Sequence, residues 1–357
     1  MLRNPPLKMP HAVRNLTILV ITLFVGACTA DARGAPDSFA PLVKKVLPSV
    51  VNIQVTEAAP NRDLLRDLPP ELRDTPLGRE FRRRFGARPE HTLGAGSGFI
   101  IDPSGIIVTN NHVVGRAEKI IVALTNGHQY PAKLIGQDPL TDIAVIKVTT
   151  NEPLYAVTWG DSREMQVGDW ILAAGNPFGL GGSVAAGIIS AEGRDLGSGP
   201  FDNFLQLDAP INPGNSGGPV FNMNGQVVGV SSVIVSPTGA SVGIGFAIPS
   251  EIVNPVVRQL LATGTFERGW LGVSVEDHDE GVLISSVDRT GPAARAGVRV
   301  GDEVMAIDGA TVSTSRGLIR AVAAETPGAN TRLTVRRDGR TMEFPVVVGL
   351  RPGPKEE

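Results

Sequence analysis

Ser216 lies in a glycine-rich run at 214–219 (GNSGGP), a setting that suits a nucleophilic serine. A serine hydroxyl attacks a carbonyl efficiently only when an imidazole takes its proton and a carboxylate orients that imidazole. Glycines beside the serine let two backbone amides point at the developing oxyanion, and we assign this oxyanion hole to the amides of Gly214 and Ser216. The run therefore predicts acyl transfer by a catalytic serine.

The general base should be one of five histidines. Four of them are less suitable. His11 lies in the N-terminal segment, His91 in a polar loop, His128 in a predicted hairpin turn and His278 in the C-terminal part of the chain. His112 instead stands at the end of an apolar strand predicted at 106–109, where a rigid scaffold can aim its ring. We therefore predict His112 as the base.

The orienting carboxylate should be Asp142 rather than Asp138. Asp138 precedes Pro139 in a predicted turn, whereas Asp142 opens the apolar run 143–148, which is typical of a buried strand. We therefore predict a catalytic triad of His112, Asp142 and Ser216.

The serine motif alone leaves two folds open, because 214–218 also satisfies the G-x-S-x-G pattern of α/β-hydrolases. That fold needs a helix after the serine and a catalytic histidine further along the chain. Here Pro219 and a predicted Asn-Gly hairpin at 224–225 follow the serine, and only His278 lies downstream. The order His, Asp, Ser in a β-rich region indicates the chymotrypsin arrangement instead.

The elements that must position these residues are short β-strands separated by turn residues over 38–262, which predicts antiparallel barrels. A helix at 249–261, with Ser250 as its cap, closes this domain. A second domain of strands and two short helices, at 292–296 and 317–324, is predicted over 266–350. Residues 57–93 break the strand pattern, and we interpret them as a long loop.

The N-terminus resembles an export signal, with basic residues through Arg14 and an apolar run at 16–25 that is too short to span a bilayer. Two interpretations stay open. Cys28 ends a lipobox-like sequence at 25–28, which would attach the chain to a membrane, and 30–32 (ADA) is a site for simple cleavage. Both place the protein in the periplasm or elsewhere outside the cytoplasm, with a signal over 1–32.

Net charge argues against nucleic acid as a partner. The chain carries a formal charge of −3, and loss of the first 28 residues, with three basic groups and no acid, would make it −6. Cys28 is the sole cysteine, so the exported body has no disulfide. We expect no metal and no other cofactor.

Six ordered motifs together resemble the HtrA (Deg) family of serine proteases. They occur at 96–100 (GSGFI), 109–114 (TNNHVV), 141–147 (TDIAVIK), 175–179 (GNPFG), 211–219 (INPGNSGGP) and 243–249 (GIGFAIP). The resemblance implies an all-β, chymotrypsin-like double β-barrel protease domain followed by a small α+β PDZ domain. It also implies an ATP-independent serine endopeptidase of protein quality control and stress response, with unfolded or damaged proteins as substrates and a homotrimer or larger assembly.

The same resemblance assigns roles to single positions. Ile211 and Ile244 would line a shallow S1 pocket for small aliphatic residues, although Leu207 and Pro210 depart from the family pattern before the nucleophile. Arg194 would be a regulatory residue that relays PDZ or substrate occupancy to the oxyanion hole. Residues 57–93 would be a regulatory loop that ends in an arginine and phenylalanine cluster.

The second domain would bind C-terminal peptides. Residues 268–273 (RGWLGV) resemble a PDZ carboxylate-binding loop, with Trp270, Leu271, Gly272 and Val273 as the peptide-binding residues. An alternative function is a chaperone or peptide-binding scaffold on an inactive protease fold. Labelling by a fluorophosphonate probe distinguishes the two functions.

Overall fold

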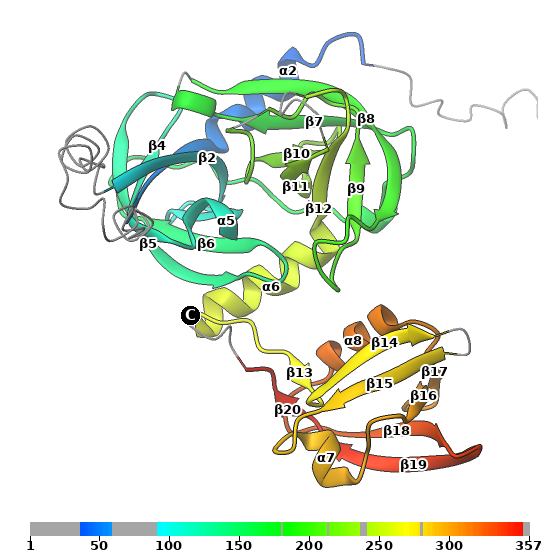
Figure 1. The fold of residues 1–357 in the computed structure, drawn as a ribbon. Helices are drawn as coiled ribbons and strands as arrows, with labels where there is room; N and C mark the ends of the chain where they lie inside the picture. Colours follow the sequence, from blue (N-terminus) through cyan, green and yellow to red (C-terminus); the bar gives the residue numbers. More distant parts are fainter. Residues whose placement is uncertain are drawn as a thin grey trace, which may run out of the picture. The chain divides into compact units, whose positions relative to one another are not determined.

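The computed structural model describes residues 36–58, 91–179, 181–212, 214–235, 241–278 and 281–352. Within these ranges the chain forms two closed antiparallel barrels and then a smaller domain of strands and helices (Figure 1). The predicted fold class is therefore confirmed. Both predictions for the signal, the lipobox at Cys28 and the cleavage site at 30–32, lie outside the described residues.

The first barrel closes in the strand order β1-β2-β3-β6-β5-β4. Its strands are β1 Val50–Ala58, β2 His91–Asp102, β3 Ile106–Asn110, β4 Ala117–Ala123, β5 Gln129–Asp138 and β6 Ile143–Val148. Helix α2 Ala40–Val46 and the 3₁₀ turn η1 Leu47–Ser49 precede it, and the single-turn helix α5 Asn111–Val114 follows β3. Branched side chains such as Ile53, Ile107 and Ile146 are fully buried inside, as expected for β-rich apolar runs.

The predicted loop at 57–93 is shorter than expected at both ends. Strand β1 continues to Ala58, and β2 begins at His91, so the prediction of a polar loop around His91 is wrong. The two strands pair up to Ala58 opposite His91, and this pairing overrides the weak local strand signal. Residues 59–90, with the arginine and phenylalanine cluster, lie outside the described residues.

The second barrel closes in the order β10-β11-β12-β9-β8-β7. Its strands are β7 Trp170–Gly175, β8 Ser183–Arg194, β9 Phe204–Leu207, β10 Pro219–Phe221, β11 Val227–Ile234 and β12 Gly245–Pro249. Two 3₁₀ turns, η2 Ser162–Glu164 and η3 Pro177–Gly179, lie before β7 and after it. The buried side chains of Ile171, Ile189 and Val228 belong to its core.

Helix α6 Ser250–Thr263 lies at the end of the second barrel and contacts β5 and β6 of the first barrel as well as β11 and β12 of the second. The prediction of the helix is confirmed, but that of Ser250 as its cap is wrong. Pro249 occupies the N-cap, and the Ser250 hydroxyl donates to the carbonyl of Gly160 at 2.8 Å. The Ser250 hydroxyl therefore bonds to a distant backbone carbonyl instead of to the amides of its own helix.

The C-terminal domain has a sheet in the order β14-β15-β16-β18-β19, with β17 paired to β16, and a separate β13–β20 pair. Its strands are β13 Gly269–Trp270, β14 Val273–His278, β15 Gly281–Val287, β16 Glu303–Ile307, β17 Ala310–Thr311, β18 Asn330–Arg337, β19 Arg340–Val347 and β20 Gly349–Leu350. The helices α7 Pro292–Ala296 and α8 Ser315–Ala324 match the two predicted helices. Helix α7 ends as predicted at Gly297, which adopts φ 91°.

No helix in the described ranges has both the length and the apolar character needed to cross a bilayer.

Candidate active site

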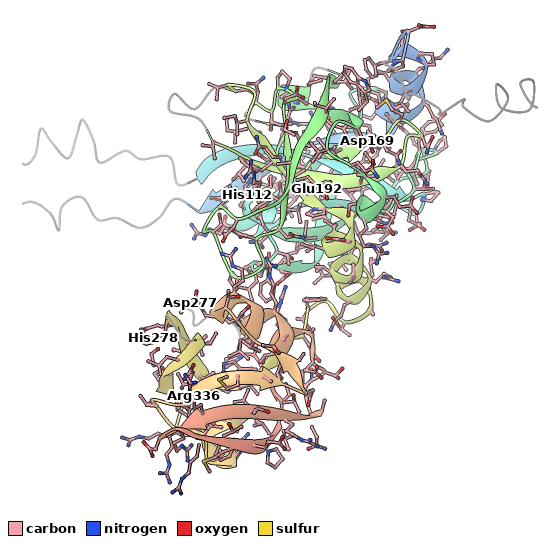
Figure 2. All side chains as sticks on the ribbon, turned by 90° about the vertical axis from the view of Figure 1, so that its right-hand side faces the viewer. His112, Asp169, Glu192, Asp277, His278 and Arg336 are labelled. Atoms are coloured by element: carbon pink, nitrogen blue, oxygen red, sulfur yellow. The ribbon has the colours of Figure 1, made fainter. Side chains whose placement is uncertain are left out.

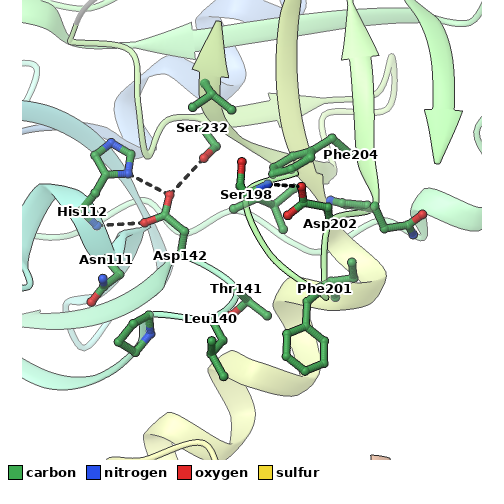
Figure 3. Close-up of a pocket in the computed structure, with 16 residues that line it drawn as sticks. Asn111, His112, Leu140, Thr141, Asp142, Ser198, Phe201, Asp202, Phe204 and Ser232 are labelled. Atoms are coloured by element: carbon green, nitrogen blue, oxygen red, sulfur yellow. Dashed lines mark hydrogen bonds and ion pairs between the residues drawn. The ribbon is translucent and has the colours of Figure 1, made fainter. Parts of the chain in front are cut away.

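His112 and Asp142 form the best-defined part of the site. His112 lies in α5, directly after β3, and its ring Nδ1 is 2.8 Å from Asp142 Oδ2 (Figure 3). The backbone amide of His112 donates to the other carboxylate oxygen, Oδ1, at 2.9 Å. With Nδ1 engaged, Nε2 is the ring nitrogen left for a substrate or a nucleophile. Asp142 therefore fixes both the orientation and the tautomer of His112.

Asp142 holds an uncommon backbone conformation directly before β6. Its φ is 57°, in the left-handed region that aspartate tolerates better than most residues. Its carbonyl accepts hydrogen bonds from the amide of Asn111 at 3.0 Å and from Asn110 Nδ2 at 2.9 Å. These two bonds stabilise the conformation that turns the carboxylate toward His112.

Asp138, the rejected alternative for the carboxylate, has a different partner. It is 3% exposed at the end of β5, and its two carboxylate oxygens accept from Nη1 and Nη2 of Arg268 at 2.7 and 2.6 Å. The same oxygens also accept from the amides of Leu140 and Thr141 at 3.4 and 3.2 Å, so they are engaged in the turn and by Arg268. The geometry thus brings Asp142, and not Asp138, to His112.

Ser216 lies in the loop between β9 and β10, on the second barrel. Gly214 and Gly217 on either side adopt φ of 94° and 84°, which explains why the run needs glycine. The Ser216 hydroxyl donates to the carbonyl of Ser232 at 3.2 Å, and within the described part of the chain no hydrogen bond joins Ser216 to His112. Within the described ranges, no residue accepts a hydrogen bond from the amides of Gly214 or Ser216. Pro213 lies outside those ranges.

Two further residues hold the site together, and the sequence reasoning missed both. Ser232, on β11, donates its hydroxyl to Asp142 Oδ2 at 3.0 Å, and Asn110 holds the Asp142 carbonyl as described above. Asn110 carried a signal, because it belongs to the motif around His112. Ser232 carried none, since a serine in a strand is a common surface residue.

A pocket of about 460 Å³ opens beside His112 and Asp142. Its apolar lining comes from the 139–141 turn, the loop before β9, the start of β9 and the start of α6 (Figure 3): Pro139, Leu140, Phe201, Phe204 and Ile252. An apolar hollow next to the imidazole can accept a substrate side chain.

The predicted S1 and regulatory residues lie on the second barrel. Ile211 is 2% exposed and packs in the barrel core, whereas Ile244 is 37% exposed just before β12. Arg194 ends β8 and donates from Nε to Gln206 Oε1 at 2.9 Å. Their roles in substrate selection and regulation stay predictions.

Three of the four predicted peptide-binding residues of the C-terminal domain line a groove between β14 and α8. Trp270, Leu271 and Val273 lie along it, and Leu318 and Val322 of α8 form the opposite wall. Gly272 adopts φ 76°, and β14 begins directly after it, at Val273. His278 ends β14 in this same domain (Figure 2).

The described ranges contain no group of three or more His, Cys, Asp or Glu side chains that could hold a metal ion.

Comparison with family models gives two matches. Residues 96–230 match the trypsin-like peptidase domain, and residues 269–348 match the PDZ domain. Together with the double barrel and the His112–Asp142 pair, these matches define a chymotrypsin-like serine peptidase with one PDZ domain.

Curated relatives narrow the class. A probable periplasmic serine endoprotease DegP-like of Brucella suis is 41% identical over 356 residues, covering 89% of this chain and 69% of its own length. A DegP-like endoprotease of Pseudomonas savastanoi is 38% identical, covering 98% of this chain and 78% of its own length.

Similar solved structures point to the same class of protein. The HtrA-type protease AlgW with a decapeptide is 39% identical, with a TM-score of 0.75, and covers 89% of this chain and all of its own. The serine endoprotease from Yersinia pestis is 32% identical, with a TM-score of 0.69. The chain belongs to the HtrA family of serine endoproteases, which does not favour the interpretation as an inactive scaffold.

Proposed function

We propose that Ser216 is the nucleophile, His112 the general base and Asp142 the orienting carboxylate of this endoprotease. The observation that carries the proposal is the Asp142 carboxylate, which accepts from His112 Nδ1, from the His112 amide and from the Ser232 hydroxyl. Three donors keep this carboxylate aligned with the ring, so it can stabilise the imidazolium that forms when His112 takes a proton.

The reaction then follows from these groups. The Ser216 hydroxyl turns from the Ser232 carbonyl toward His112 Nε2, gives up its proton and attacks the peptide carbonyl. The amides of Gly214 and Ser216 are proposed to bind the oxyanion. His112 next protonates the leaving amine, and it activates a water that hydrolyses the acyl-enzyme.

The proposed substrates and the proposed regulation of the protease are those that the family resemblance implies. Unfolded or damaged proteins are the proposed substrates, with Ile211 and Ile244 in a shallow S1 pocket for small aliphatic residues. The groove at Trp270–Val273 would bind peptide C-termini and regulate the protease through Arg194. The apolar walls of this groove and the decapeptide bound by the related AlgW support this proposal.

Compartment and assembly are proposed on the same basis. The export signal over 1–32 and the naming of the relatives as periplasmic support a periplasmic enzyme, with membrane attachment if Cys28 is lipidated. We propose a protease domain over 38–262, a PDZ domain over 266–350 and a homotrimer or larger assembly.

The decisive experiment is cleavage of unfolded casein by wild type and Ser216→Ala. We expect the variant to lose cleavage and fluorophosphonate labelling while its thermal unfolding stays close to that of the wild type. Ser104→Ala, which removes an exposed hydroxyl from the β2–β3 turn, is the matched control and should cleave like the wild type. Cleavage by Ser216→Ala would overturn the assignment.

A further inference from the structure

Ser97 is a buried polar residue of β2 that the proposed triad does not use. Its exposure is 0%, and its backbone carbonyl accepts from Thr109 Oγ1 at 2.7 Å within the first barrel. Its side chain and amide, by contrast, bind segments of the second barrel. A buried hydroxyl normally has a hydrogen-bond partner, so the choice of partners is informative.

Three contacts join Ser97 to the second barrel. Its hydroxyl donates to the carbonyl of Gly214 at 2.6 Å and accepts from the amide of Asn176 at 2.8 Å. Its own amide donates to the carbonyl of Ser216 at 2.8 Å. One residue of the first barrel thus holds the carbonyls of both residues whose amides are the proposed oxyanion donors.

We infer that Ser97 is a positioning residue for the oxyanion hole, acting through the backbone of Gly214 and Ser216. The inference rests on the proposed function of Ser216. A carbonyl held against Ser97 cannot turn toward the substrate, where its negative end would oppose the developing oxyanion. The peptide between Gly214 and Asn215 is fixed on its other side as well, because the Asn215 amide donates to the Asn212 carbonyl at 3.0 Å.

Steric contacts reinforce this arrangement. A Cβ atom at Gly217 would lie 2.2 Å from the Ser97 carbonyl oxygen and 2.3 Å from Thr109 Oγ1. The nucleophile loop is therefore packed directly against the backbone of Ser97, with no space for a side chain between them. Loss of the Ser97 hydroxyl would leave the Gly214 carbonyl and the Asn176 amide without that partner in a buried position.

Because Ser97 is fully buried, it cannot touch a substrate, and this separates a positioning role from a binding role. In Ser97→Ala we expect kcat on a fluorogenic peptide to fall about 10- to 100-fold, somewhat less than for loss of an oxyanion donor itself. KM should stay within about twofold of the wild type. The rate of fluorophosphonate labelling at Ser216 should fall with kcat, since the phosphonyl oxygen uses the same donors.

Ser49→Ala is the matched control. Ser49 is 1% exposed, and its hydroxyl donates to the Val46 carbonyl at 2.6 Å, so the substitution removes an equally short buried hydrogen bond far from the nucleophile loop in sequence. We expect a similar loss of thermal stability but wild-type kcat and labelling. An equal loss of kcat in Ser49→Ala, or wild-type kcat in Ser97→Ala, would overturn the inference.

If Ser97→Ala does not fold, Ser97→Cys keeps a weak donor at this position, and its kcat should lie below that of the wild type by several-fold. A folded Cys variant with wild-type kcat would overturn the positioning role. A wild-type enzyme that neither cleaves nor labels would instead remove the proposed role of Ser216, and the positioning role with it.

Discussion

In the first barrel, His112 and Asp142 are held by hydrogen bonds to each other and to neighbours in the same barrel. Among the described residues, Ser232 supplies the one hydrogen bond from the second barrel. In the second barrel, Ser216 lies in a loop that depends on left-handed glycines and on Ser97 of the first barrel. The acid–base pair is thus largely preformed by its own barrel, whereas the nucleophile loop takes its shape from both.

This difference shows where the proposed activity is easiest to change. A strand end with three hydrogen bonds to one carboxylate resists small displacements. The nucleophile loop is bonded to both barrels, through Gly217 to Ser231 of β11 and through Ser216 to Ser97 of β2, so it responds to a shift between the barrels. Three substitutions test this comparison.

Asp142→Asn should have the largest effect. The amide would favour the wrong tautomer of His112 and could not stabilise the imidazolium, so kcat should fall about 10,000-fold while the fold is retained. Initial rates on a fluorogenic peptide measure this effect. Asp102→Asn, at the exposed end of β2 in the same barrel, should keep kcat within about twofold. A loss of kcat below tenfold in Asp142→Asn would show that the His112–Asp142 pair contributes less to catalysis than its geometry indicates.

Gly217→Ala should have the next largest effect, and Gly127→Ala is its matched control. Both glycines have nearly the same φ, 84° and 88°, but a Cβ at Gly127 meets nothing within 4 Å. Gly127→Ala should therefore show only the cost of placing a side chain at positive φ, about 1 kcal/mol in the free energy of unfolding. Gly217→Ala adds the clash with Ser97 and should lose about 3 kcal/mol or more, together with most of its activity.

Urea unfolding and casein cleavage, measured on the same preparations, check both glycine variants. Equal stabilities for the two would contradict the tight packing of the nucleophile loop against the first barrel.

The smallest effect is expected from loss of the Asp161 carboxylate, and it depends on pH. Asp161 lies in the connection between β6 and β7, where it caps η2 and pairs with Arg163. Hydrogen bonds from the Arg163 side chain and then from its amide lower the pKa of Asp161 from 3.8 to about 2. A carboxyl group whose pKa is lower in the folded state stabilises the fold above its unfolded pKa and loses that contribution as the pH falls.

The melting temperatures of wild type and Asp161→Asn should therefore differ by a constant, small amount above about pH 5 and converge between pH 3.8 and about 2. Added salt should reduce the difference, since the pair is exposed. A difference that grows in acid would contradict the assignment.

Much of the fold followed from local patterns. The turn glycines Gly105, Gly127 and Gly225 all adopt positive φ, and strands β15 and β16 contain the apolar runs at 282–284 and 304–307. Such signals are readable because turn conformation and strand alternation depend on residues close in sequence. The cap at Ser250 and the loop around His91 were wrong because distant partners outweighed the local preference.

The sequence by itself determined the residue types, their order along the chain and the glycines around Ser216, and those were enough to predict the triad and the family. Only the tertiary structure decided that Asp138 binds Arg268, that Ser232 supports Asp142 and that Ser97 holds the nucleophile loop. These pairs lie 130, 90 and 117 positions apart. The last two contacts depend on how the two closed barrels pack against each other, and the first on how the segment after α6 returns to β5, which no local pattern of side chains encodes.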